Sequence, residues 1–200
     1  MAERVGVYGS AFNPPHMGHA SVLAVAKEQL ELDLVIIVPT GDPYHKEVQP
    51  EPDKEVRFRL AEAAFGGLFK VEVSRIEVDR DGPSYTCDTL GGIENLHPDS
   101  EIHLLMGADS AKDFAGWHRP ERILELATVA VAPRVEVESE EVEAVFAGLG
   151  ASDRLRFLEM PEVAISSSQV RERIGKGEAY RNLVPGPVAE IIENEDLYGI

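Results

Sequence analysis

Short apolar runs alternate with longer segments of helical periodicity along most of the chain. Runs rich in Val, Ile and Leu that stop near a Gly or Pro are typical of strands buried on both faces of a parallel sheet. The predicted strands occupy residues 4–9, 34–39, 101–109, 128–133 and 155–160, together with 70–78, where alternation of apolar and polar positions predicts one wetter face.

Segments with apolar residues three or four positions apart predict helices between these strands. They occupy residues 18–32, 53–65, 84–96, 120–127, 167–177 and 187–198. Asp53 is the expected N-cap of the second helix. The alternation predicts an α/β fold, a Rossmann-like doubly wound parallel sheet with helices on both faces. We expect one domain over residues 1–200, with a small helical C-terminal part at about 165–200.

Composition narrows the class of protein. The chain has 200 residues, 44% hydrophobic and 28% charged, as in ordinary soluble proteins, and no apolar run of transmembrane length or signal-peptide pattern is expected. The single cysteine, Cys87, excludes an intramolecular disulfide, so a cytoplasmic location is expected. The net charge of -17 argues against nucleic-acid or anionic-membrane partners. A phosphate substrate would therefore need positive charge gathered locally.

The sequence GSAFNPPHMGH, residues 9–19, follows the first predicted strand, where ligands bind in doubly wound sheets. Gly9 and Ser10 allow backbone N–H groups to approach an anion, and a helix N-terminus follows. His16 and His19 are three residues apart and would share one face of that helix. Spacing alone leaves three interpretations open: metal ligation, which would need a third ligand from elsewhere, two satisfied structural histidines, or phosphate binding.

Three further stretches carry candidate chemistry. In ISSSQVRER (165–173), a serine run precedes a helix whose Arg171 can reach back toward an anion at the helix N-terminus. His45 and Lys46 lie on the long loop 40–53, a length that is usually functional or mobile. Tyr85 and Trp117 are candidates for enclosing a planar ring.

Taken together, these motifs resemble the nucleotidylyltransferase superfamily, which has G-x-x-F-[ND]-P-x-H-x-G-H after the first strand and S-S-x-x-x-R near the C-terminus. The intermediate motifs resemble the bacterial nicotinate-nucleotide adenylyltransferases. They fall in the family's order over nearly the whole chain and read VPTGDPYHK, GPSYTCDTL, MGAD, GWH, VAPR and LVPGPVAEIIENEDLYG.

The resemblance implies adenylyl transfer from ATP to nicotinate mononucleotide, giving deamido-NAD and pyrophosphate, with Mg²⁺ held mainly by the ATP phosphates and not by protein side chains. His16, His19 and Arg171 would be catalytic, with His19 the expected transition-state donor. The implied ATP-binding residues are Gly9, Ser10, Phe12, His16, His19, Gly107, Asp109, Ser167, Ser168 and Arg171. The implied mononucleotide-binding residues are Asn13, His45, Lys46, Tyr85, Thr86, Trp117 and Arg134.

Several positions depart from the family pattern. Asn13 replaces the usual Asp, His118 replaces a Tyr found in some members, and Val135 follows Arg134 where Pro-Gly is usual. The last two touch the expected acceptor pocket. Nicotinamide mononucleotide or another phosphorylated acceptor is therefore the alternative, with a non-catalytic nucleotide sensor as a third interpretation. The sequence leaves open whether the chain forms a homo-oligomer.

Overall fold

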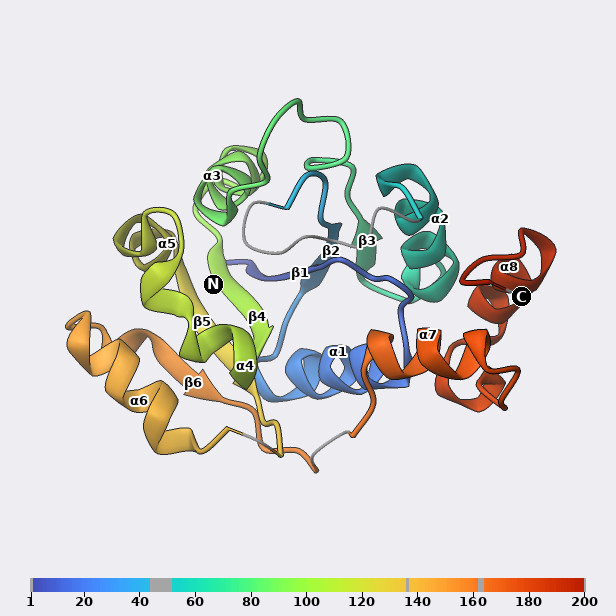
Figure 1. Ribbon diagram of the computed structural model, residues 1–200. Coiled ribbons are helices and arrows are strands. Elements are labelled where there is room, and N and C mark those ends of the chain that lie inside the picture. The colour runs from blue at the N-terminus through green and yellow to red at the C-terminus, as the bar shows by residue number, and fades with distance from the viewer. Residues whose placement is uncertain (1, 44–51, 136, 162–163, 200) are drawn as a thin grey trace.

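The computed structural model describes residues 2–43, 52–135, 137–161 and 164–199, which form a parallel sheet between two layers of helices (Figure 1). Within these residues the sheet has six strands in the order β3-β2-β1-β4-β5-β6, and every neighbouring pair is parallel. The predicted doubly wound fold is confirmed. The strands are β1 (Arg4–Ser10), β2 (Leu34–Pro39), β3 (Val71–Val73), β4 (Glu101–Gly107), β5 (Ala127–Ala132) and β6 (Leu155–Phe157).

Two apolar clusters bury the two faces of the sheet. Helices α1 (Met17–Gln29) and α2 (Lys54–Phe65) cover one face through side chains such as Leu23 and Phe65. The other face packs against further helices through side chains such as Leu90, Ile123 and Phe146. The helices on this second face are α3 (Thr86–Leu96), α4 (Ala108–Lys112), α5 (Pro120–Leu126) and α6 (Ser139–Gly148).

A third cluster joins the C-terminal helices to the outside of α2. Helices α7 (Ser167–Gly175) and α8 (Gly186–Asn194) pack Val170 and Ile192 against Leu60. Figure 1 shows these two helices at the edge of the molecule beside α2. No helix of the described ranges is long and apolar enough to span a membrane.

The third strand is shorter than the sequence predicts. It ends at Val73, and the Ser74 N–H still donates to Ile37 O over 2.8 Å before the chain turns. Val78 is nevertheless buried, and Ile76 packs against the cluster that contains α3. The apolar residues after Val73 face the interior from a turn. Their alternation with polar residues resembles that of a half-buried strand, so the sequence pattern does not distinguish the two.

Local signals elsewhere act as expected. Asp53 caps α2, its Oδ1 accepting from Val56 N–H over 2.9 Å. Ser166 caps α7, and its side chain accepts from the backbone N–H of Gln169 at 3.2 Å. Because Ser166 takes the capping role, the next two serines are left with other partners.

Candidate active site

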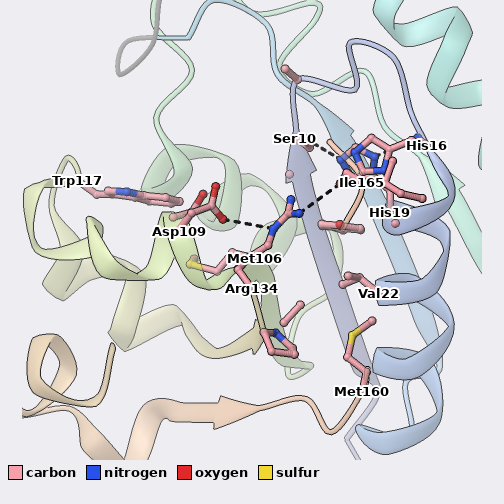
Figure 2. Close-up of a pocket in the computed structure, with 18 residues that line it drawn as sticks. Ser10, His16, His19, Val22, Met106, Asp109, Trp117, Arg134, Met160 and Ile165 are labelled. Carbon is pink, nitrogen blue, oxygen red and sulfur yellow. Dashed lines mark hydrogen bonds and ion pairs between the residues drawn. The ribbon is translucent and has the colours of Figure 1, made fainter. Parts of the chain in front are cut away.

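A cavity of about 280 Å³ opens at the carboxyl ends of β1, β4 and β5, where the strand order reverses. Figure 2 shows its walls: Trp117 and Asp109 lie on one side, His16 and His19 of the α1 region lie on the other, and Arg134 extends between them. The cavity therefore joins both halves of the sheet, as expected for a ligand site in this fold.

The two histidines form one hydrogen-bonded unit at the start of α1. His16 is the N-cap residue, and its backbone N–H donates to His19 Nδ1 over 3.2 Å. The two ring centroids are 3.8 Å apart. Because His19 Nδ1 accepts, the hydrogen of the neutral His19 ring is on Nε2. That Nε2 lies 3.4 Å from Ser10 Oγ at the cavity wall.

Burial keeps both imidazoles neutral near pH 7. Burial, followed by the charge of Arg134, lowers the pKa of His16 to about 4. Burial, followed by His16 and then Arg134, lowers the pKa of His19 well below its usual value. The two histidines can therefore donate ring N–H groups to an anion at the N-terminus of α1, where the helix dipole is positive, without carrying a full positive charge themselves.

The geometry separates the three interpretations of the histidine pair. Among the described residues, no group of three His, Cys, Asp or Glu side chains could hold a metal ion, so this part of the chain gives the metal interpretation no support. His16 Nδ1 is buried and has no hydrogen-bond partner within the part of the chain that the structure describes. Because buried polar atoms are usually paired, this atom does not fit two satisfied structural histidines. Contact with a ligand remains the interpretation that the arrangement favours.

Gly9, near the end of β1, and Phe12, in the loop that follows, occupy different surroundings. Gly9 lines the cavity, and a Cβ there would have no atom within 4 Å. Phe12 is fully buried with a φ of 48°. Its ring centroid lies 5.0 Å from that of His19 and 5.6 Å from that of Phe65. Phe12 therefore supports His19 from behind and does not line the cavity.

The opposite wall carries the expected adenosine residues. Gly107 and Asp109 both line the cavity, and a Cβ at Gly107 would lie 2.6 Å from Asp109 Oδ1. Arg134 Nε lies 4.0 Å from the same oxygen, and its Nη1 donates to Ile165 O over 3.2 Å. Arg134 therefore brings positive charge into the cavity and ties β5 to the segment before α7.

A second cavity, of about 200 Å³, adjoins the first. The two share four lining residues, which are Gly9, Ala11, Ser110 and Trp117. Thr86, the first residue of α3, lines the second cavity. Tyr85 lies beside it, where its ring stacks on His118 with centroids 4.0 Å apart. His45 and Lys46 lie outside the described residues.

The sequence did not single out Glu77, although its carboxylate lines the second cavity and is largely buried. Oε1 accepts from Thr89 Oγ1 at 2.7 Å, and Oε2 accepts from the Gly41 N–H at 3.3 Å. Ser84 Oγ accepts from the Asp42 N–H at 3.1 Å. These bonds tie the loop after β2 to the cavity wall. The only sequence feature that could have pointed to Glu77 is that this acidic residue stands between two apolar residues, Ile76 and Val78.

The serine and arginine motif of α7 meets the loop after β1, 153 or more residues earlier. Ser167 Oγ donates to Pro14 O over 2.9 Å, and Arg171 Nη1 donates to Asn13 O over 2.7 Å. Arg171 Nη2 also donates to Ser168 Oγ at 3.2 Å. Ser168 and Arg171 line a separate hollow beyond this loop, so the structure brings the two motifs together without placing these side chains on the first cavity.

Asn13 also lies outside both cavities. Its side chain is buried, and its Oδ1 accepts a hydrogen bond from Tyr198 Oη over 2.8 Å. The sequence motifs do not indicate this contact, because its two residues are 185 positions apart.

Comparison with known proteins places the chain in a family. Residues 7–173 match the family model described as cytidylyltransferase-like. A protein of Thermomicrobium roseum named "Probable nicotinate-nucleotide adenylyltransferase" is 37% identical over 196 residues, covering 98% of this chain and 91% of its own. A Clavibacter michiganensis protein of the same name is 37% identical over 195 residues, with 98% and 94% covered.

The fold also matches a solved structure, the Plasmodium falciparum nicotinic acid mononucleotide adenylyltransferase complexed with NaAD. The TM-score is 0.80 at 17% identity, with 98% of this chain and 97% of that chain covered. The sheet topology, the histidine pair after β1 and the family model define a nucleotidylyltransferase-type domain. Within that class, the chain belongs to the nicotinate-nucleotide adenylyltransferase family.

Proposed function

We propose that this protein transfers the adenylyl group of ATP to nicotinate mononucleotide, giving deamido-NAD and pyrophosphate in NAD biosynthesis. The observation that carries the proposal is the pair of adjoining cavities, which meet at Gly9 and Trp117 beside the two histidines. Two substrates bound there would have their phosphates side by side, as a direct transfer between them requires.

The reaction needs alignment and charge stabilisation more than proton transfer. An oxygen of the mononucleotide phosphate attacks the α-phosphorus of ATP, the bond to the bridging oxygen breaks, and pyrophosphate leaves with the negative charge. The attacking phosphate is already ionised, so no general base is required. Donors placed where charge develops on the leaving group supply the catalysis.

On this proposal, His16 and His19 donate to the ATP phosphates. The Nε2–H of His19 beside Ser10 suits the transition-state role, because the His16 backbone holds the ring in the donating tautomer. The charge of Arg134 and the N-terminus of α1 oppose the protein's net charge of -17 locally. Gly9 lets the ligand approach the backbone, and Gly107 and Asp109 face the adenosine.

Ser167, Ser168 and Arg171 are proposed to hold the β- and γ-phosphates, with Arg171 catalytic. Their bonds to the loop after β1 support this role indirectly, because they keep a second helix N-terminus beside the first. Those bonds would have to be exchanged in part for phosphate contacts when ATP binds. Phe12 is proposed to act by supporting His19.

The second cavity is proposed to hold the mononucleotide. Trp117 would stack on the pyridine ring, and Thr86 at the N-terminus of α3 would favour the nicotinate carboxylate over the neutral amide. Arg134 and Tyr85 would complete the surroundings. His45 and Lys46 remain the proposed contacts to the mononucleotide phosphate. Asn13, whose buried side chain lies outside both cavities, is proposed to act through the loop that leads to His16 and not by touching a substrate.

Magnesium is proposed to arrive with ATP. The described residues offer no group of three potential protein ligands, so phosphate oxygens and water would hold the ion, which supplies charge neutralisation when bound. We further propose a cytoplasmic enzyme without nucleic-acid or membrane partners, supported by one cysteine and the net charge of -17.

The decisive experiment compares nicotinate and nicotinamide mononucleotides by steady-state kinetics with ATP and Mg²⁺. A higher kcat/KM for nicotinate supports the proposal. Preference for the amide, or for another phosphorylated acceptor, would change the acceptor and keep the chemistry. ATP binding without turnover of any acceptor would favour the sensor interpretation. The His19 ring held as an Nε2–H donor argues against that interpretation, because a sensor needs no transition-state donor.

A further inference from the structure

The C-terminal end of the described chain reaches the loop that leads into the histidine pair. Tyr198 follows α8, and its hydroxyl donates to Asn13 Oδ1 over 2.8 Å. Asn13 lies three residues before His16, the N-cap of α1. Asn13 is buried, so its amide oxygen would lose its described partner if this hydroxyl were removed.

Side chains from other parts of the chain donate hydrogen bonds to several backbone carbonyl oxygens of the loop between β1 and α1. Arg57 Nη1 donates to Ala11 O at 3.1 Å, Arg171 Nη1 donates to Asn13 O at 2.7 Å, and Ser167 Oγ donates to Pro14 O at 2.9 Å. These donors occupy carbonyl oxygens that would otherwise repel a polyphosphate nearby. They all act on the backbone, whereas Tyr198 acts on a side chain of the loop.

The C-terminal turn is held in a backbone conformation that its residues rarely adopt. Asp196 and Tyr198 both have positive φ, 50° and 68°. Such conformations persist where surrounding contacts over-determine them. Tyr198 also packs beside the apolar cluster of α7 and α8. Burial raises the pKa of Tyr198, so its hydroxyl remains protonated and able to donate throughout the ordinary pH range.

We propose that Tyr198 is a positioning residue for the phosphate end of the ATP site. Its hydroxyl fixes the Asn13 side chain and thereby the loop that carries His16 into the cavity. The inference rests on the proposed function, since it concerns the placement of the donors for ATP phosphates. Tyr198 touches no substrate on this account and acts through Asn13.

The main test replaces Tyr198 by Phe, which keeps the ring and removes the hydroxyl. Tyr180→Phe is the matched control, because Tyr180 belongs to the same apolar cluster and its hydroxyl donates to Glu193 Oε1 at 3.3 Å, away from the loop. We expect kcat/KM for ATP to fall about tenfold in Tyr198→Phe. KM for the mononucleotide should stay within about twofold, and Tyr180→Phe should keep wild-type kinetics.

A double-mutant cycle with Asn13→Ala tests the route of the effect. If Tyr198 acts through Asn13, the double variant should be no worse than Asn13→Ala alone. Should Tyr198→Phe fail to fold, Asn13→Asp keeps an acceptor oxygen for Tyr198 and should lose less activity than Asn13→Ala. Equal losses in those two variants would overturn the inference.

Thermal unfolding of the same proteins completes the test. Tyr198→Phe and Tyr180→Phe should lower Tm by similar amounts, so that only the kinetic loss distinguishes them. Kinetics of Tyr198→Phe equal to those of Tyr180→Phe would reduce Tyr198 to a packing residue. A wild-type protein without adenylyl transfer would instead refute the proposed function, an outcome that the wild-type assay reveals separately.

Discussion

The backbone N–H of His16 donates to Nδ1 of His19, and this one bond sets which nitrogen of His19 carries a hydrogen toward the cavity. A side chain that donates from the Nε2 position should therefore replace His19 better than one that donates from the Nδ1 position. The bond also links helix capping to chemistry, because the residue that begins α1 orients the candidate transition-state donor.

His19→Ala should lower kcat about 100-fold and leave ATP affinity close to that of the wild type, because the donor acts mainly in the transition state. His19→Gln, whose amide N–H can approach the Nε2 position, should retain more activity than His19→Asn. Steady-state kinetics and calorimetric ATP titration measure the two effects. An unchanged kcat in His19→Ala would remove His19 from the mechanism.

Acid should destabilise the protein through His16. Burial holds its pKa at about 4 in the folded protein, below the ordinary value of 6.5. The stabilising contribution of the neutral ring is thus fully present above pH 6.5 and is lost as pH falls toward 4. At pH 5 the loss from this residue is about 2 kcal/mol relative to pH 7.

Urea unfolding at pH 7 and pH 5 measures this loss. His16→Asn is the matched variant, because Asn is a favoured N-cap residue and does not titrate. The wild type should lose about 2 kcal/mol more free energy of unfolding than His16→Asn between the two pH values. Parallel losses would mean that His16 titrates normally in the folded protein.

Trp117→Ala should raise KM for both substrates, because Trp117 lines both cavities. The larger rise, about tenfold, is expected for the mononucleotide, whose ring would lose its stacking partner. Trp117→Phe should retain part of the affinity, since an aromatic face remains. Equal rises for ATP and the mononucleotide in Trp117→Ala would reject the stacking role.

Chelation of divalent metal should remove the activity of the protein without changing its thermal stability. EDTA should abolish turnover and Mg²⁺ should restore it, because the ion is proposed to travel with ATP. Tm of the ligand-free protein should not change, since the described residues hold no cluster that would bind the ion alone. Full turnover without divalent metal would contradict the proposal, and a fall in Tm would indicate a structural metal.

The sequence was sufficient to predict the parallel sheet and the shared face of His16 and His19. Buried runs such as residues 34–39 have one stable solution in an α/β chain, and the spacing of His16 and His19 sets their shared face. Local spacing could not predict which way the loop residues face. Phe12 and Asn13 lie between cavity-lining neighbours, yet they point into the core and toward Tyr198.

Glu77 is the opposite case, a residue that lines a cavity although the sequence did not indicate it. Glu77 lies in the segment 70–78, which was predicted as a strand with one wetter face, whereas β3 ends before it and the turn buries its carboxylate at the second cavity. The partners that make this burial tolerable, Thr89 and Gly41, come from two other parts of the chain. Only tertiary structure brings them together.

Gly9→Ala offers a clean separation of folding from function. Gly9 lines both cavities, and the space that a Cβ would take is empty of protein atoms within 4 Å. The variant should therefore fold with a free energy of unfolding within about 0.5 kcal/mol of the wild type. Its methyl group would occupy space that the substrates need, so kcat/KM should fall at least about tenfold.

The matched control is Gly91→Ala, on α3, where a Cβ also has no atom within 4 Å. Because alanine favours helix interiors, this change should raise the free energy of unfolding by up to about 1 kcal/mol and leave kinetics unchanged. Urea unfolding and steady-state kinetics on both variants make the comparison. A fully active Gly9→Ala enzyme would mean that the substrates do not meet at Gly9, and the two-cavity arrangement would then lose its central support.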